Sequence, residues 1–134
     1  MKTFLASIVT AAALMAGAAP LAAETRAEKA ETRVAEMLEG RTAGEPRNCI
    51  TALNSSDLRV LEHVGIVYER GDTIWLARAS DPRQLGISDV PIFDRFGSQL
   101  CRTDVIRTVD RGSGFFTGSV FLEPFVPYTR TAEG

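Results

Sequence analysis

Residues 65–78 read Gly-Ile-Val-Tyr-Glu-Arg-Gly-Asp-Thr-Ile-Trp-Leu-Ala-Arg, and this stretch decides the fold. Two runs rich in β-branched and aromatic residues, 65–69 and 73–78, flank the short turn sequence Arg70-Gly71-Asp72. Such side chains fit a pleated, half-buried surface, and glycine permits a tight turn between antiparallel strands. The stretch therefore predicts a β-hairpin.

Similar short runs, separated by turn residues, lie on both sides of the hairpin. They cover residues 49–51, 59–63, 91–96, 99–101, 104–109 and 115–122. Pro124 and Pro127 keep the last segment extended and are typical of a sheet edge, because proline cannot donate a ladder hydrogen bond. About seven short strands predict a mainly β (α+β) fold, either a small antiparallel sheet or a partly open barrel.

One amphipathic helix is predicted before the strands, over residues 25–39. Thr25-Arg26-Ala27-Glu28 has the form of a capping box, and Gly40 follows where a left-handed C-cap would lie. A narrow apolar stripe with helical spacing is formed by Ala30, Val34, Met37 and Leu38. Because the stripe buries little, we expect this helix to be the least stable element.

The N-terminal segment has the layout of a secretory signal peptide. Lys2 precedes the apolar run 4–16, and small residues lead to Ala23 before the polar Glu24. The apolar run is shorter than the roughly 20 residues that span a bilayer. We therefore expect cleavage near Ala23 and a periplasmic or secreted protein with no transmembrane segment in the mature chain.

This segment sets the first of three predicted regions. Residues 1–23 are the signal peptide, residues 24–46 the N-terminal helix and a linker, and residues 47–134 the β domain. The linker is predicted over 40–46, because its two glycines and one proline interrupt a helix.

The charge balance argues against nucleic acid as a partner. The chain has 15 basic and 17 acidic residues, a formal net charge of −2. Loss of Lys2 with the signal peptide would leave 14 − 17 = −3. A protein that neutralises phosphates needs a basic excess instead. The partner is unknown, with an envelope protein as one possibility.

The two cysteines, Cys49 and Cys101, predict one disulfide, because paired cysteines in an exported chain are usually oxidised. A metal or redox pair is the alternative. It has less support, since the chain has no Cys-x-x-Cys and only one histidine. No cofactor or metal site is predicted.

Several polar residues are candidates for catalysis, and none is assigned a catalytic role. His63, the only histidine, is interpreted as an ordinary strand residue without an evident nucleophile. The acidic residues of the C-terminal half, with arginines nearby, fit either a carboxylate pair of a hydrolase or surface ion pairs, and the ion-pair interpretation is favoured. These residues are Asp94, Asp104 and Asp110, with Arg95, Arg102, Arg107 and Arg111. Gly112-Ser113-Gly114 is interpreted as a turn rather than a phosphate-binding loop, because no helix follows it.

Two aromatic groups have both a binding and a packing interpretation. Trp75, Tyr68, Phe93 and Phe96 could line a pocket or a glycan-stacking platform, but aromatic residues on central strands more often belong to the core, which is the favoured interpretation. Residues 124–128 contain a Pro-x-x-Pro sequence, which could bind an aromatic groove. The favoured interpretation is an extended tail whose Phe125 and Tyr128 pack on the sheet.

Several segments together resemble a family of small exported bacterial proteins known only as a domain of unknown function. These segments are 38–46 leading into 48–50, 96–104 with Gly-Ser-Gln-Leu-Cys, 110–114, and 125–129 with Phe-Val-Pro-Tyr. The resemblance implies a small, exported, mainly β domain and no particular activity. Broader relatives often carry two further cysteines, and the corresponding residues 79–82 and 122–125 contain none here. The absence of both cysteines is what the loss of one complete disulfide bridge would produce.

These observations predict an exported protein that is a non-catalytic periplasmic binding module or an envelope-associated module. The alternative is a small hydrolase that uses Asp94, Asp104 and Arg102.

Overall fold

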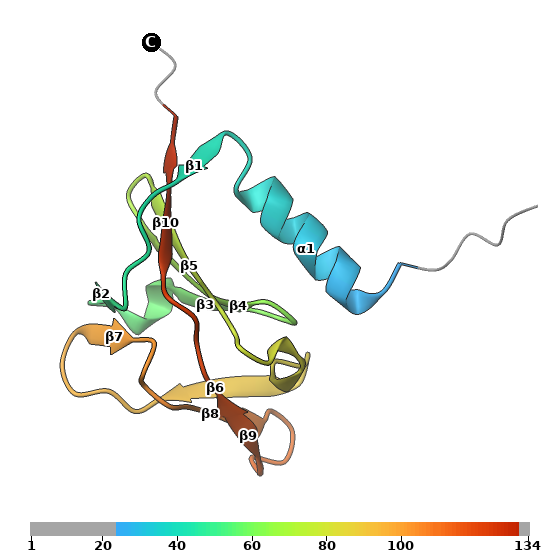
Figure 1. Ribbon diagram of the computed structural model, residues 1–134. Coiled ribbons are helices and arrows are strands. Elements are labelled where there is room, and N and C mark those ends of the chain that lie inside the picture. The colour runs from blue at the N-terminus through green and yellow to red at the C-terminus, as the bar shows by residue number, and fades with distance from the viewer. Residues whose placement is uncertain (1–23, 132–134) are drawn as a thin grey trace, which may run out of the picture.

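The computed structural model describes residues 24–131, so the predicted signal peptide at 1–23 lies outside the described residues (Figure 1). The described chain folds into one α-helix and three antiparallel sheets, none of which closes into a barrel. The prediction of a mainly β fold with one N-terminal helix is confirmed. None of the helices described is long and apolar enough to cross a membrane.

The largest sheet has five strands built around the predicted hairpin. Its order is β1 (Arg41–Ala43), β10 (Val126–Arg130), β5 (Thr73–Arg78), β4 (Gly65–Arg70) and β3 (Leu58–Leu61). β4 and β5 pair through six positions from Gly65–Arg78 to Arg70–Thr73, so the hairpin is confirmed. A Cβ atom at Gly65 would lie 2.0 Å from the Ala77 carbonyl oxygen, so only glycine allows the two strands to approach this closely.

The prediction of an edge position for the proline-containing tail is wrong. β10 is the second strand of the sheet, between β1 and β5. In a strand, the N–H and C=O of one residue point to the same neighbour. The Pro127 carbonyl accepts a hydrogen bond from the Gly44 N–H at 2.7 Å, just beyond the end of β1. The N–H group that proline lacks would also have pointed toward this side of β10 and away from β5. Its absence therefore leaves the hydrogen bonds between β10 and β5 intact.

β1 itself corrects a second prediction, because residues 41–43 of the expected linker form a strand. The two glycines do not prevent this, since they flank the strand. Gly40 adopts a φ of +71°, and Gly44 avoids a side chain that would crowd the Pro127 ring.

Two smaller sheets complete the fold. β2 (Cys49–Thr51) pairs with β7 (Gln99–Cys101), and β8 (Ile106–Asp110) lies between β6 (Asp89–Phe93) and β9 (Phe116–Val120). Single-turn 3₁₀ helices cover Ser55–Asp57 and Pro82–Gln84. The predicted strands all exist, with ends shifted by a few residues, and Phe96 lies beyond the end of β6.

The helix α1 (Arg26–Met37) covers one face of the five-stranded sheet. Its capping box is present: Thr25 Oγ1 accepts a hydrogen bond from the Glu28 N–H, and the Glu28 carboxylate accepts one from the Thr25 N–H. The predicted stripe faces the sheet, where Ala30 and Val34 are buried. Three strand residues, Val67, Ile74 and Leu76, and Val64 from the turn before β4 supply the rest of the buried residues in this cluster.

The opposite face of the sheet holds the larger core. The buried residues there come from all three sheets and the segments between them: Ile50, Ala52, Ile66, Tyr68, Ala77, Ala79, Leu85, Leu100, Ile106, Val120, Leu122 and Phe125. Phe125 is fully buried in it and Tyr128 packs against the helix-side cluster, so the packing interpretation of the tail is confirmed. Ala79 and Leu122 form an isolated antiparallel bridge, so the segments 79–82 and 122–125 meet at these two residues and run apart from there.

His63 does not lie in a strand, and that interpretation is wrong. It occupies the tight turn between β3 and β4 with a φ of +59°, and its N–H donates to the Leu85 carbonyl at 3.0 Å. Positive φ is uncommon outside glycine, although histidine tolerates it better than β-branched residues do. The turn hydrogen bond from the Val64 N–H to the Leu61 carbonyl, 3.0 Å long, closes around it.

Candidate functional site

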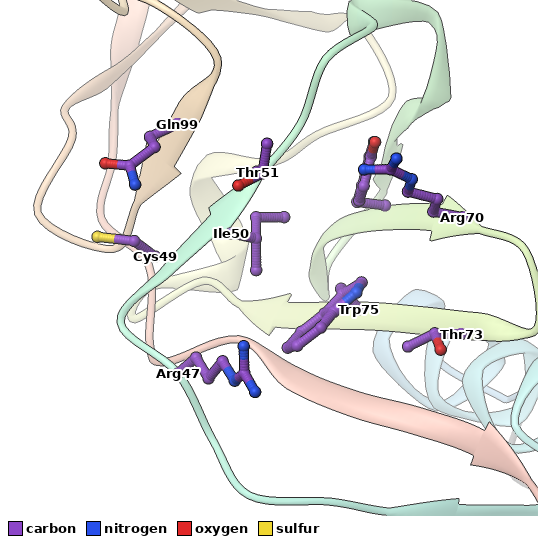
Figure 2. Close-up of a pocket in the computed structure, with 9 residues that line it drawn as sticks. Arg47, Cys49, Ile50, Thr51, Arg70, Thr73, Trp75 and Gln99 are labelled. Carbon is purple, nitrogen blue, oxygen red and sulfur yellow. The ribbon is translucent and has the colours of Figure 1, made fainter.

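A cavity of about 560 Å³ lies between the end of the β4–β5 hairpin and the β2–β7 ribbon (Figure 2). Nine residues line it: Arg47, Cys49, Ile50, Thr51, Tyr68, Arg70, Thr73, Trp75 and Gln99. Its volume is in the range of small-molecule sites, which are usually about 300–1,000 Å³. The cavity is therefore large enough for a ligand rather than a single water molecule.

The floor of the cavity is one face of the hairpin. Tyr68 pairs with Trp75 and Arg70 pairs with Thr73, so all four side chains share this face of the antiparallel pair. The intervening residues, such as Ile74, point to the helix side. Alternation along two strands thus separates the residues that hold α1 from those that line the cavity.

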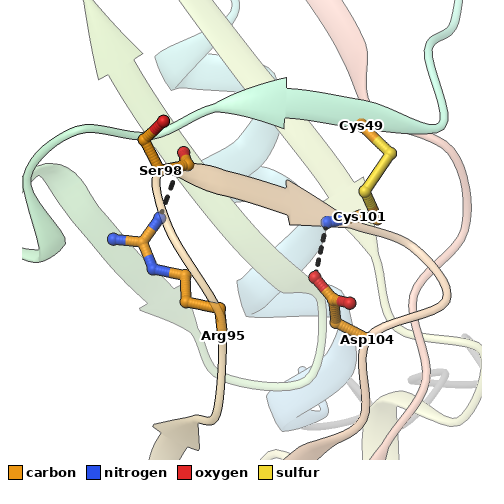
Figure 3. Close-up of a disulfide and its surroundings, with 5 residues drawn as sticks. All are labelled: Cys49, Arg95, Ser98, Cys101 and Asp104. Carbon is orange, nitrogen blue, oxygen red and sulfur yellow. Dashed lines mark hydrogen bonds between the residues drawn. A yellow bond between two sulfur atoms is a disulfide. The ribbon is translucent and has the colours of Figure 1, made fainter.

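The wall of the cavity is the β2–β7 ribbon, which the disulfide cross-links (Figure 3). Cys49 and Cys101 are directly opposite, with an S–S distance of 2.02 Å and a Cα–Cα distance of 4.0 Å. The next pair along, Asn48 and Arg102, is hydrogen-bonded through the Arg102 N–H. The cysteines therefore occupy a non-hydrogen-bonded pair, where opposed side chains are closest. The predicted disulfide is confirmed.

Two polar side chains hold the ribbon ends. The Asp104 carboxylate accepts a hydrogen bond from the Cys101 N–H at 2.8 Å. On the other strand end, Arg95 donates to the Ala52 carbonyl at 2.6 Å and to the Ser98 carbonyl at 3.5 Å. The cavity wall is thus fixed covalently at one end and by hydrogen bonds at the other.

The cavity is electrostatically one-sided. Among the residues that the structure describes, its lining includes two arginines and no acidic residue. The salt bridges found within residues 24–131 use Arg59, Arg78, Arg83 and Arg107, and leave Arg47 and Arg70 without a carboxylate partner in that region. Thr51, Thr73 and Gln99 add neutral hydrogen-bonding groups. This combination favours an anion with further polar groups.

Arg47 is held over the aromatic side chain of the site. Its guanidinium carbon lies 5.6 Å from the centre of a Trp75 ring, within the range of a cation–π contact. Arg47 approaches from the side of β10, through its bridge to Phe125, whereas Arg70 belongs to β4. The two guanidinium groups lie on opposite sides of Trp75 in Figure 2.

The acidic catalytic candidates each have a local structural partner. Asp94 forms an ion pair with Arg107 on the surface, and Asp104 binds the Cys101 N–H. Asp110 accepts hydrogen bonds from the N–H groups of Ser113 and Gly112, and the Ser113 bond is the main reason why the pKa of Asp110 is lowered. Residues 112–114 are thus the turn that was predicted. None of these carboxylates lines the cavity.

The remaining candidates lie apart from the cavity or only partly in it. His63 lines a separate hollow beside α1 with Arg26, Lys29 and Arg33. Among the four aromatic candidates, Tyr68 and Trp75 line the cavity, Phe93 packs on the larger core, and Phe96 is fully exposed. No group of three or more potential metal-binding side chains occurs among the residues described.

Sequence reasoning missed Arg47 and Arg70. Arg47 directly follows the expected linker and Arg70 belongs to the expected hairpin turn, so both have the pattern of ordinary surface residues. Their shared position depends on the pairing of β10 with β5 and on the placement of the β2–β7 ribbon. No local motif contains that information.

Comparisons with protein-family models, with curated proteins and with solved structures found no match. The function therefore has to be argued from the cavity itself.

Proposed function

We propose that this chain is an exported, non-catalytic binding module whose cavity holds a small anionic ligand. The observation that carries the proposal is the pair of arginines, Arg47 and Arg70, which flank Trp75 in a cavity without an acidic side chain. Within residues 24–131 neither arginine is neutralised by a carboxylate. An anionic ligand would supply the missing charge.

The stacking of Arg47 favours binding of a carboxylate or phosphate. A guanidinium presents a planar set of donors that matches both anions in a bidentate manner. Contact with the Trp75 ring restricts the Arg47 side chain before the ligand arrives. Less side-chain entropy is then lost on binding, which increases affinity.

The lining residues also support binding over catalysis. The nine residues include neither a carboxylate nor a histidine, the side chains that most often act as general bases. The sulfur of Cys49 is in the disulfide and is not a thiolate nucleophile. The hydroxyl and amide groups of Thr51, Thr73 and Gln99 are suited to orienting a polar ligand.

Export is supported by the signal-like N-terminal sequence and by the disulfide, which persists in oxidising compartments. We place the protein in the periplasm or outside the cell, where a small acidic metabolite or an acidic envelope component is the kind of ligand that the cavity fits. We propose an envelope protein as a further partner.

Calorimetric titration tests the proposal with inorganic phosphate, galacturonate and galactose as probes. We expect at least one of the two anions to bind saturably and the neutral galactose not to bind. Arg47→Gln and Arg70→Gln should each weaken anion binding about tenfold or more, because a charge-assisted hydrogen bond is lost. Arg83→Gln is the control, since Arg83 is exposed and lies outside the cavity.

The proposal fails if neither anion binds at millimolar concentration, or if the two cavity variants bind as tightly as the control.

A further inference from the structure

The two arginines of the cavity reach it from different strands, on opposite sides of β5. The N–H and C=O of Arg47 are both hydrogen-bonded to Phe125, at 2.8 Å each. Two residues further along β10, the Pro127 carbonyl bonds to the β1 side, so Arg47 also lies on that side of β10. Arg70 ends β4, which lies beyond the other edge of β5. Trp75 of β5 therefore lies between the two arginines, as Figure 2 shows.

The strand register gives the separation of the two arginines. Across the sheet, β10 and β5 lie between Arg47 and β4, which amounts to three strand spacings or about 14 Å. Along the strands, Arg47 is level with Ala77. Arg70 is paired with Thr73, four residues earlier in β5, which adds about 13 Å. On the diagonal the two Cα atoms are therefore roughly 20 Å apart.

A single carboxylate or phosphate would not form a full pair with both arginines. The guanidinium carbon of Arg47 is 5.6 Å from the centre of a Trp75 ring. Arg70 is the diagonal neighbour of Trp75 across the β4–β5 pair, about 7–8 Å away between Cα atoms. A bidentate pair aligns one anionic group with one guanidinium. With the indole between them, a lone anion pairs with one arginine and is attracted by the other only at longer range.

The rest of the lining is polar in part but uncharged. The other seven lining residues that the structure describes carry no charge. Thr51 and Gln99 face each other across the β2–β7 ribbon, and Thr73 is paired with Arg70. Their hydroxyl and amide groups can donate to and accept from hydroxyl groups. The cavity thus has two cationic ends and neutral hydrogen-bonding groups elsewhere.

We propose that the ligand carries two anionic groups joined by an uncharged polyol or sugar, one group paired with Arg47 and the other with Arg70. This inference rests on the proposed function, since it concerns the same cavity, and it adds the number and placement of the anionic groups. Two anionic groups also balance the two guanidinium charges that have no carboxylate partner within residues 24–131. A volume of about 560 Å³ is sufficient for such a ligand.

Calorimetric titration with galactarate and galactonate tests the inference. Both are linear sugar acids with the same polyol chain, but galactarate has a carboxylate at each end and galactonate at one end only. Galactarate should bind the wild-type protein about tenfold more tightly or better, because it adds a second charge-assisted pair. Fructose bisphosphate and fructose phosphate form the corresponding pair for phosphate groups, and they show which anionic group the cavity prefers.

Variants assign the second anionic group to an arginine. Arg47→Gln and Arg70→Gln should each reduce the ratio of dianion to monoanion affinity to about one, because only one full pair remains. Arg83→Gln is the control, since Arg83 lies outside the cavity, and it should keep the wild-type ratio. The melting temperatures of the variants check that each remains folded, and the comparison of ligands on the wild-type protein needs no variant.

Equal affinities of the wild-type protein for dianion and monoanion, in both ligand pairs, would overturn the inference and leave the proposed function standing. A dianion preference that persists in both cavity variants would overturn it as well. If none of the four anions binds at millimolar concentration, the proposed function itself is wrong and the inference falls with it.

Discussion

The two faces of the five-stranded sheet are covered in different ways. On one face, a single helix packs through Ala30 and Val34 onto a small cluster. On the other face, strands from two further sheets build a cluster twice as large, and a disulfide cross-links one of its layers. The buried residues of the helix side are one alanine, three valines, one isoleucine and one leucine, whereas the opposite side also buries the aromatic residues Tyr68 and Phe125.

The difference shows where a site can form. On the helix side Ile74, near the tip of the hairpin, is buried, whereas on the other face Arg70 and Thr73 at the same end of the hairpin line the cavity. The exposed part of the hairpin then forms the floor of the cavity, with Tyr68 and Trp75 at the boundary between core and site. The larger core and the candidate site thus share one sheet face, while the other face packs against the helix.

The largest expected effect is on the core side. Phe125→Ala removes a fully buried aromatic ring from the larger cluster and should lower the free energy of unfolding by about 3–5 kcal/mol. Phe121→Ala is the control, because that side chain is 55% exposed, and it should cost much less. Urea denaturation measures both. Equal losses of unfolding free energy in the two variants would contradict the burial of Phe125 in the larger cluster.

Removal of the disulfide should have the next largest effect. The double variant Cys49→Ser/Cys101→Ser opens a cross-link between residues 52 positions apart and should cost about 2–5 kcal/mol. It should also weaken anion binding, because the ribbon forms the cavity wall. Treatment of the wild-type protein with a reducing agent should reproduce the loss of stability, and the double variant should not respond to the same treatment.

The helix side should tolerate a comparable deletion better. Val34→Ala leaves a smaller cavity, and alanine has the higher helix propensity, so a cost of about 1–2 kcal/mol is expected. Hydrogen exchange of the wild-type protein adds a local measurement. Amides near Val34 should exchange faster than those of Ile66–Leu76, since α1 can open without the rest of the sheet. Equal protection would show that the helix is not a separate, weaker unit.

The smallest effect concerns the ion pair that joins α1 to β5. Arg78 donates hydrogen bonds to both Glu31 carboxylate oxygens, at 2.6 and 3.1 Å, and this lowers the pKa of Glu31 below its ordinary value of 4.5. A lowered folded-state pKa contributes stability above that ordinary value and loses it as the pH falls through the folded-state pKa. Both side chains are about half exposed, so the contribution is at most about 1 kcal/mol.

Glu31→Gln should therefore destabilise the protein slightly at pH 7, and the difference from wild type should disappear in acid. Thermal unfolding at pH 7 and near pH 3 checks this. Glu36→Gln is the control, because Glu36 is on the same helix and has no ion pair within residues 24–131. A difference that persists unchanged in acid would contradict the ion-pair explanation.

Local signals account for the elements that sequence reasoning predicted well. The capping box at Thr25 and the turn at Gly71 act within a few residues, so the helix and the hairpin were predictable. The position of β10 was not, because the effect of Pro127 depends on where β1 ends. His63 was also misplaced, since the turn that it occupies contains no glycine before Gly65.

The candidate site was only partly predictable for the same reason. Trp75 and Tyr68 were recognised as possible lining residues because large aromatics in a hairpin either fill a core or border a cavity. Arg47 and Arg70 are 23 residues apart and meet only through the packing of separate strands. The disulfide was predictable from the number of cysteines, because two cysteines allow only one intramolecular pairing.

The most direct test of the central claim is an amide-resolved NMR titration of the protein with the anion that binds most tightly. The account predicts saturable shifts at Arg47, Thr51, Arg70 and Thr73, together with the Trp75 indole N–H, and no shifts along α1. The largest shifts on α1, or shifts that never saturate, would contradict the assignment of binding to the face opposite the helix.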